Sequence, residues 1–190
     1  MGGTFDPPHD GHLALARAAA AQLALDRVLL VPAAAPPHKP DGVATPAATR
    51  LAMVRAAVGE DPLLEASAAE IDRPGPSYTA DTLEDIAAAN PGADLWFILG
   101  ADQLAGFPTW SRPDRIVELA RLAVASRPGA GDPAMDFLAG TVAAGRVDVL
   151  DMPEVPISST DVRARVSRGE DVSHLVPAGV AALLATGAGY

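Results

Sequence analysis

The 190-residue chain contains no cysteine, one lysine and few aromatic residues. The absence of cysteine excludes disulfides and thiolate metal sites. Acidic residues outnumber basic ones by 24 to 14, and a net charge of −10 opposes binding to nucleic acid or to an acidic membrane surface. The longest apolar run, 13–25, is too short to span a bilayer and is interrupted by Arg17. The chain does not begin with a basic segment followed by an apolar one, so we expect a cytoplasmic protein.

Short apolar runs alternate with helix-forming segments along the whole sequence. The strands are expected at 28–31, 63–71, 95–99, 122–125 and 147–150, and the helices at 13–25, 45–58, 79–89, 113–119, 133–144, 159–168 and 177–184. This alternation predicts an α/β fold with a doubly wound, mostly parallel sheet and helices on both faces. With 49% apolar residues, we expect one domain over 1–190, helical from about 157 onwards.

The most informative segment is Gly-Gly-Thr-Phe-Asp-Pro-Pro-His-Asp-Gly-His at residues 2–12. Glycines leave backbone N–H groups open to an anion, and two imidazoles, His9 and His12, follow at the start of a helical pattern. The alternatives are a core or capping histidine and a metal pair. Because no further His or Cys lies nearby and glycines suit an anion better than a cation, we favour a phosphate site without a protein-bound metal.

The single lysine, Lys39, follows a stiff Pro-Pro-His lead in a loop. One interpretation is an exposed loop charge. The other, which we favour, is an ammonium group placed to meet a phosphate.

Two further segments follow predicted strands, where parallel sheets present their ligand contacts. Ile157-Ser158-Ser159-Thr160-Asp161-Val162-Arg163 opens a helix, and it is either an ordinary Ser/Thr cap or an anion site built from N–H groups, hydroxyls and Arg163. Gly100-Ala101-Asp102 places a carboxylate that either contacts a ribose or a bound cation, or caps a short helix.

An aromatic residue and a predicted helix start could each have either a structural or a ligand-binding role. Trp110 lies in a loop and either stacks on a planar heterocycle or packs at the edge of the core, whereas Trp96 lies inside an apolar strand and is interpreted as packing. The segment 77–82, Ser-Tyr-Thr-Ala-Asp-Thr, begins a helix whose free N–H groups could bind a carboxylate.

In this order, the segments resemble bacterial nicotinate-nucleotide adenylyltransferases, a family of nucleotidyltransferases with a His-x-Gly-His signature. Pro-Pro-His-Lys and Ser-Tyr-Thr-x-Asp-Thr resemble the nicotinate-nucleotide branch in particular, while the first and last motifs mark the superfamily. The resemblance implies transfer of the adenylyl group of ATP to nicotinate mononucleotide, giving nicotinate adenine dinucleotide and pyrophosphate for NAD biosynthesis. Another adenylyltransferase or cytidylyltransferase and a catalytically inactive nucleotide-binding protein remain as alternatives.

The resemblance also implies residue roles. Catalysis would depend on His9, His12, Lys39 and Arg163. Contacts to ATP, with Mg²⁺ carried on its phosphates, would come from Gly3, Thr4, Phe5, His9, His12, Gly100, Asp102, Ile157, Ser158, Ser159 and Arg163. Lys39, Tyr78, Thr79 and Trp110 would bind nicotinate mononucleotide, with Thr79 and its neighbouring amides on the carboxylate and Trp110 on the ring. A homo-oligomer is compatible with this assignment.

One departure from the family is expected. The hydrophobic strand that precedes the Gly-Gly-Thr-Phe loop in the family, and lies centrally in its sheet, is missing from this chain. We therefore expect the native start to lie upstream of Met1.

Overall fold

The computed structural model describes residues 1–36, 43, 45–104, 106–126, 145–153 and 155–187. It divides into two compact units, each described by itself below. The terminal unit comprises Gly3–Pro76 and Val155–Tyr190, and the central unit comprises Met1–Gly2 and Ser77–Glu154. A single domain over 1–190 stays a prediction.

The terminal unit is built around the sheet β1-β2-β3, formed by Gly2–Gly3, Val28–Pro32 and Leu64–Ala66. Strands β2 and β3 are parallel, with Val28 opposite Leu64. Helices α1 (Asp10–Gln22), α2 (Ala47–Val58), α3 (Ala69–Asp72), α8 (Ser159–Ser167) and α9 (Ala178–Ala185) complete the unit.

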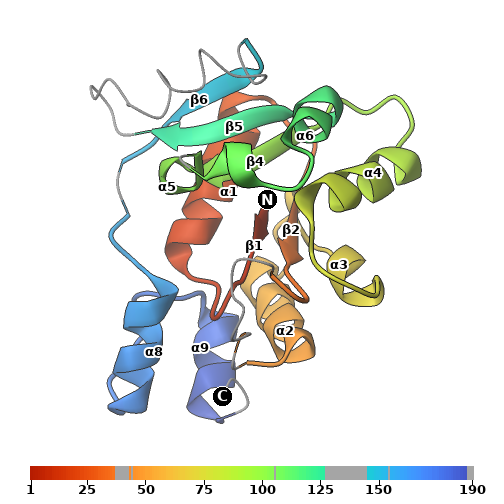
Figure 1. The fold of residues 1–190 in the computed structure, drawn as a ribbon. Coiled ribbons are helices and arrows are strands. Elements are labelled where there is room, and N and C mark those ends of the chain that lie inside the picture. The colour runs from red at the N-terminus through yellow and green to blue at the C-terminus, as the bar shows by residue number, and fades with distance from the viewer. Residues whose placement is uncertain (37–42, 44, 105, 127–144, 154, 188–190) are drawn as a thin grey trace. The chain divides into compact units, whose positions relative to one another are not determined.

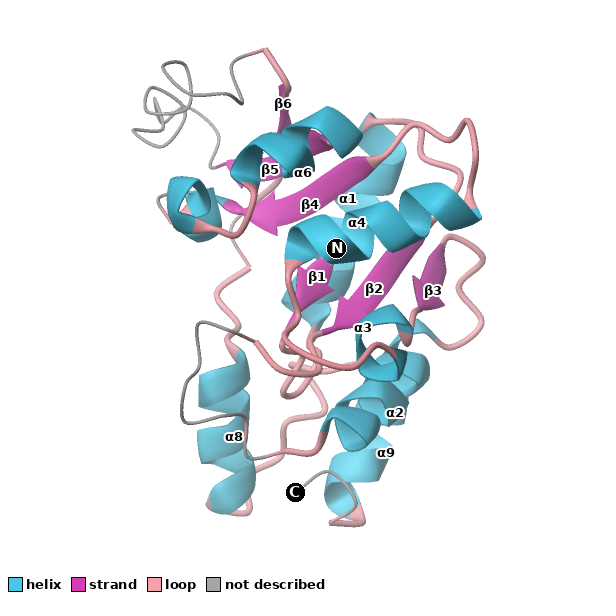
Figure 2. Cartoon of the chain, turned by 45° about the vertical axis from the view of Figure 1, so that its right-hand side comes forward, coloured by secondary structure: helices cyan, strands magenta, loops and turns pink. Residues whose placement is uncertain are grey.

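Helix α2 packs against β2, β3 and α9, and it lies alongside α9 in both ribbon views (Figures 1 and 2). Its contact with α9 is close because of a glycine: a Cβ added at Gly179 would lie 2.5 Å from the carbonyl oxygen of Ala56. The two backbones therefore meet without an intervening side chain.

The central unit contains the sheet β4-β5-β6, formed by Trp96–Gly100, Arg121–Ser126 and Val147–Asp151. All its pairings are parallel, with Trp96 opposite Arg121 and Leu122 opposite Val147. Helices α4 (Thr79–Ala89), α5 (Ala101–Leu104) and α6 (Pro113–Leu119) and the 3-10 turn η1 (Phe107–Thr109) accompany it. One apolar cluster joins α4 and α6 to β4 and β5, and α4 contacts α6 directly (Figure 2).

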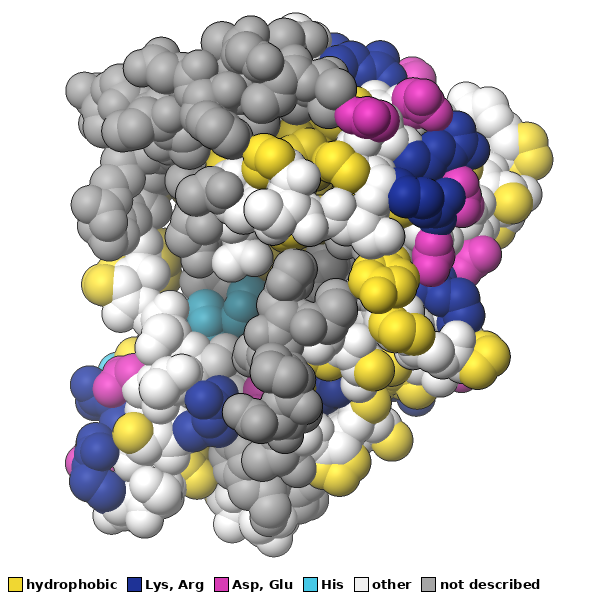
Figure 3. Space-filling view, viewed as in Figure 1, with side chains coloured by type: hydrophobic (Ala, Val, Ile, Leu, Met, Phe, Trp, Pro, Cys, Tyr) yellow, Lys and Arg dark blue, Asp and Glu magenta, His cyan; other side chains and the backbone are white. Residues whose placement is uncertain are grey.

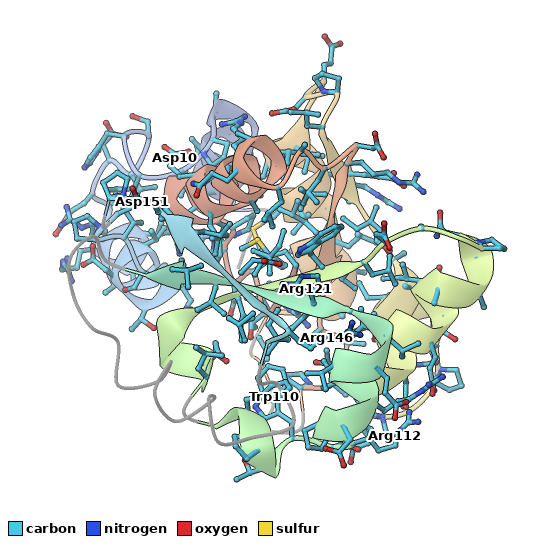
Figure 4. The ribbon with its side chains drawn as sticks, turned by 90° about the horizontal axis from the view of Figure 1, so that it is seen from above. Asp10, Trp110, Arg112, Arg121, Arg146 and Asp151 are labelled. Carbon is cyan, nitrogen blue, oxygen red and sulfur yellow. The ribbon has the colours of Figure 1, made fainter. Side chains whose placement is uncertain are left out.

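Asp148 of β6 connects the three strands of this sheet. It accepts hydrogen bonds from Trp96 Nε1 at 2.8 Å and from Arg121 Nε at 2.7 Å. Arg121, the first residue of β5, is labelled in Figure 4. Trp96, predicted to act in packing alone, thus also donates a hydrogen bond across the sheet.

Most predicted elements are confirmed within a few residues. The extended segment 63–71 is correct only in its first part: β3 ends at Ala66 and α3 forms a helical turn, opened by Ser67, whose hydroxyl accepts the Ala69 N–H at 3.3 Å. The helix predicted at 133–144 lies outside the described residues. The hydrophobic strand expected to be missing before the Gly-Gly-Thr-Phe loop has no counterpart in the described residues: β1 consists of Gly2 and Gly3 of the loop itself and lies at one end of the strand order.

Among the helices that the structure describes, none is long and apolar enough to cross a membrane.

Candidate active site

The two histidines of the first motif stack on each other at the start of α1. Their ring centroids are 3.6 Å apart, and the ring of Phe5 meets His12 edge-on at 5.0 Å. His9 is the residue before the helix, with an extended backbone, so the chain turns from loop to helix between the two rings. The sequence prediction that His9 and His12 act together is consistent with this placement.

The hydrogen bonding of His12 sets its tautomer. Its Nδ1 accepts the backbone N–H of His9 at 3.1 Å, so Nδ1 carries no proton and the neutral ring carries it on Nε2. Burial lowers the pKa of His9 to about 4. Burial, with a smaller contribution from His9, lowers the pKa of His12 to about 3. At neutral pH both rings are therefore uncharged, and His12 presents a neutral N–H donor.

Gly11 is the residue that lets the His9 ring lie over the first turn. A Cβ at Gly11 would be 3.1 Å from His9 Nδ1 and 3.2 Å from its Cε1. Any side chain there would press on the ring. The glycine of the His-x-Gly-His motif therefore acts through space for the ring rather than through backbone freedom.

The loop before the histidines is fixed by a buried arginine. Arg50 of α2 is 1% exposed; its Nη1 donates to the carbonyl oxygen of Thr4 at 2.7 Å, and its Nε donates to that of Thr45 at 3.1 Å. Burial lowers its pKa, and the opposing influence of Asp6 and Glu70 keeps a cation acceptable there. Arg50 thus holds the loop by its backbone.

The same loop has two features typical of a constrained site. Phe5 is buried with a φ of +51°, a conformation that non-glycine residues seldom adopt. A Cβ at Gly3 would lie 3.1 Å from the Phe5 ring, and the Gly3 carbonyl accepts the N–H of Ala33 at 2.9 Å. Gly3, Thr4 and Phe5, all predicted to bind ATP, therefore form one rigid turn beside His12.

Helix α8 brings the last motif to this loop. Arg163 Nη1 donates to the Asp6 carbonyl oxygen at 2.6 Å, and the Ser159 hydroxyl donates to that of Pro7 at 2.9 Å. Ser158 caps the helix by accepting the Asp161 N–H at 3.1 Å, the ordinary role that the sequence had left open. Ile157 donates its N–H to Val155 at 2.8 Å.

The side chains of Arg163 and Asp6 carry opposite charges, and neither is fully hydrogen-bonded within the described part of the chain. Arg163 is partly exposed and also donates to the Thr160 hydroxyl, so its bonds to Asp6 and Thr160 use two of the five N–H groups of a guanidinium. Asp6 is 5% exposed, with one carboxylate oxygen 3.9 Å from Arg163 and the other without a partner among the described residues. His9 Nδ1 has none there either. Most buried polar atoms in proteins have a hydrogen-bond partner, so these unpaired atoms distinguish this loop from the rest of the terminal unit.

In the central unit, the residues predicted to meet the nicotinate lie at the start of α4 and after η1. Tyr78 precedes α4 and accepts the N–H and hydroxyl of Thr82, both at 3.2 Å, while Thr79 is the first helical residue. Trp110 packs at 5.8 Å from the Phe97 ring and 5.7 Å from the Phe107 ring. Trp110 is only partly buried, so core-edge packing is present and stacking on a ligand stays a prediction.

Gly100 ends β4, opposite Ala125, and α5 begins at the next residue. Asp102 belongs to α5, and its side chain lies outside what the structure describes, as does Lys39 entirely. Within the described part of the chain, no group of three or more His, Asp or Glu side chains could hold a metal ion.

The chain is similar to known proteins over most of its length. Residues 1–165 match the family model described as cytidylyltransferase-like. A Streptomyces coelicolor protein named "Probable nicotinate-nucleotide adenylyltransferase" is 44% identical over 95% of this chain and 93% of the relative. One of the same name from a Nocardioides species is 45% identical over 97% of this chain and 89% of the relative. The chain belongs to the nicotinate-nucleotide adenylyltransferase family.

A solved structure supports the fold. The Plasmodium falciparum nicotinic acid mononucleotide adenylyltransferase complexed with NaAD aligns with a TM-score of 0.78, covering 99% of this chain and 94% of that one, at 15% identity. At this identity the likeness concerns the fold, which is the Rossmann-like α/β nucleotidyltransferase architecture. The fold class predicted from the sequence is thereby confirmed.

Sequence reasoning missed two residues that shape the histidine loop of this adenylyltransferase family member. Arg50 lies three and four residues before Met53 and Val54, both fully buried, so a charge on the apolar face of a predicted helix was the available signal. Gly11 was part of the motif, but nothing in one sequence shows what a Cβ would meet.

Proposed function

We propose that this protein transfers the adenylyl group of ATP, supplied with Mg²⁺, to nicotinate mononucleotide, with nicotinate adenine dinucleotide and pyrophosphate as products. A phosphate oxygen of the mononucleotide attacks the α-phosphorus of ATP. The bond from the α-phosphorus to the bridging oxygen of the β-phosphate breaks, and pyrophosphate leaves with the electron pair. The reaction needs no protein nucleophile, so its rate depends on alignment and charge stabilisation.

The observation that supports this most is the His12 tautomer. With Nδ1 occupied by the His9 backbone, the N–H on Nε2 is a fixed, neutral donor for a phosphate oxygen. Because burial lowers the pKa of His12 to about 3, it is a poor proton acceptor at neutral pH, which suits a positioning role better than a basic one.

The positive charge for the phosphates would come from Arg163, with Lys39 as a second contributor. Arg163 is bound through Nη1 to the Asp6 backbone, which places a cation beside the histidine loop. Ser159 reinforces the same junction through Pro7. Gly100 and Asp102 would serve the adenosine side, and the start of α4 with Trp110 would serve the nicotinate.

We also propose that the acid is preferred over the amide substrate. The N-terminal amides of α4, from Thr79 onwards, bear the positive end of the helix dipole. A carboxylate gains from such donors a charge-assisted interaction that a neutral carboxamide does not.

The direct test offers the purified protein MgATP with one acceptor at a time and measures pyrophosphate release and the dinucleotide product. Nicotinate mononucleotide should be used best. Turnover with phosphopantetheine or a cytidylyl transfer alone would establish a different member of the superfamily. ATP binding with no product from any acceptor would establish a nucleotide-binding protein without this activity.

The residue test compares two histidine variants. His12→Ala should lower kcat at least about 100-fold through loss of the aligned donor, with little change in thermal stability. His174→Ala, which removes an exposed histidine of the same unit, is the matched control and should behave as wild type. Equal activity of the two variants would contradict the role given to His12.

A further inference from the structure

Arg112 joins the beginning of α6 to the first turns of α4. Its Nη1 and Nη2 donate to the two carboxylate oxygens of Glu84 at 3.0 and 3.1 Å, and Nη2 also donates to Asp81. A fork against a carboxylate is the most directional ion pair that proteins form. Basic and acidic side chains alternate on the side of the molecule where α4 and α6 lie (Figure 3).

The backbone at Arg112 is unusual for an arginine. With φ 53° and ψ 56° it is left-handed, directly before Pro113, which opens α6. Side chains with a Cβ disfavour this conformation. The three guanidinium bonds to α4 hold the residue there, so the turn that follows Trp110 has a defined geometry.

One partner of Arg112, Asp81, lies in the first turn of α4. Asp81 is the third residue of α4 and Thr79 the first, so the Asp81 carboxylate belongs to the same helical turn as the amides assigned to the nicotinate carboxylate. Trp110, assigned to the nicotinate ring, is two residues before Arg112, and both are labelled in the lower part of Figure 4. An uncompensated carboxylate in that turn would repel an anionic substrate.

We propose that Arg112 is a positioning and specificity-determining residue for the acidic mononucleotide: it neutralises Asp81 in the first turn of α4. The inference rests on the proposed function. The start of α4 attracts a substrate carboxylate only while the negative charge of Asp81 is offset by Arg112.

A neighbouring arginine provides the control. Arg115 Nε donates to Glu84 at 2.8 Å and its Nη1 to Glu118 at 2.9 Å, without a bond to Asp81. Together the two arginines lower the pKa of Glu84 to about 2, Arg112 contributing most. Removing Arg112 therefore leaves Glu84 bound to Arg115 and leaves Asp81 without its guanidinium.

The experiment measures KM for nicotinate mononucleotide and for MgATP in wild type, Arg112→Gln, Arg115→Gln and Arg112→Lys. At separations of several ångströms in a partly solvated site, one unpaired charge should raise KM for the mononucleotide roughly three- to tenfold. Arg112→Gln should show this rise with KM for MgATP unchanged. Arg115→Gln and Arg112→Lys, which each leave a cation beside the acidic residues, should stay within about twofold of wild type.

A fifth variant separates charge from shape. Adding Asp81→Asn to Arg112→Gln removes the unpaired carboxylate and should return KM for the mononucleotide towards wild type. An Arg112→Gln variant with wild-type KM, equal rises for both substrates, or no recovery in the double variant would overturn the inference while leaving the proposed function intact. A wild-type protein that makes no nicotinate adenine dinucleotide would overturn both.

Discussion

Replacing Gly11 with alanine should damage the site while leaving the fold in place. The added Cβ would lie 3.1 Å from His9 Nδ1, 3.2 Å from His9 Cε1 and 3.5 Å from Val155 Cγ1. The first two distances are a few tenths of an ångström below ordinary contact. Because Gly11 already has a helical backbone in α1, the substitution introduces no conformational strain of its own.

The expected loss of kcat/KM depends on how far the His9 ring can move away from the added Cβ. It is 7% exposed and stacked on His12 at 3.6 Å, so a displacement caused by a side chain at Gly11 is passed on to His12, the proposed phosphate donor. A displacement of about 1 Å can cost about 100-fold in rate, and a shift of a few tenths should therefore lower kcat/KM for MgATP about 5- to 20-fold. The gain in helix propensity, at most about 1 kcal/mol, offsets the compression, so stability should change by less than about 1 kcal/mol.

The assay is initial-rate pyrophosphate release at varied MgATP, with urea unfolding of the same preparations. A Gly11→Ala variant with wild-type kcat/KM would refute the reasoning, because it would show that the ring tolerates a side chain beneath it. A variant that loses several kcal/mol of stability would refute the claim that Gly11 serves the ring rather than the fold.

Three further outcomes are expected. The folded-state pKa values of about 4 for His9 and about 3 for His12 lie below the unfolded value of 6.5, so the unfolded chain binds more protons below pH 6.5 and stability falls as the pH drops through that value. Between pH 7 and pH 5 each ring should account for roughly 2 kcal/mol of the free energy of unfolding in urea, and replacing both with Asn should flatten the slope. Arg50→Met should cost about 3–5 kcal/mol in urea unfolding because it leaves buried carbonyls and carboxylates without their cation, and a loss below about 1 kcal/mol would contradict that accounting. Gly179→Ala, whose Cβ would meet the Ala56 carbonyl at 2.5 Å, should lower stability by about 1–3 kcal/mol with kcat/KM unchanged; an unaltered melting temperature would show that α2 and α9 separate freely.

The sequence predicted well wherever the signal was local. The strand at 28–31 and the helix that ends at Leu119 could be predicted because apolar periodicity and proline or glycine boundaries are properties of neighbouring residues. The segment 63–71 failed in its second half because alanines beside a serine favour a helical turn once Ser67 can accept a backbone N–H.

The sequence indicates candidate site residues but not the contacts that they make. His9 and His12 were identified from spacing, but their stacking and the His12 tautomer depend on three-dimensional placement. Arg163 was identified as a cation near phosphate, yet its bond to the Asp6 carbonyl connects residues 157 positions apart, which no local pattern encodes.

The long span between Ser159 and Pro7 has a consequence for biosynthesis. The terminal unit is discontinuous: its first part ends at Pro76 and its second begins at Val155. The residues between these two parts, together with Met1–Gly2, form the central unit. During translation the histidine loop therefore leaves the ribosome long before α8, the C-terminal helix whose side chains bond to it. Nascent chains stopped before α8 would bear the complete signature motif without Arg163 and Ser159, so the loop gains these two bonds only late in synthesis.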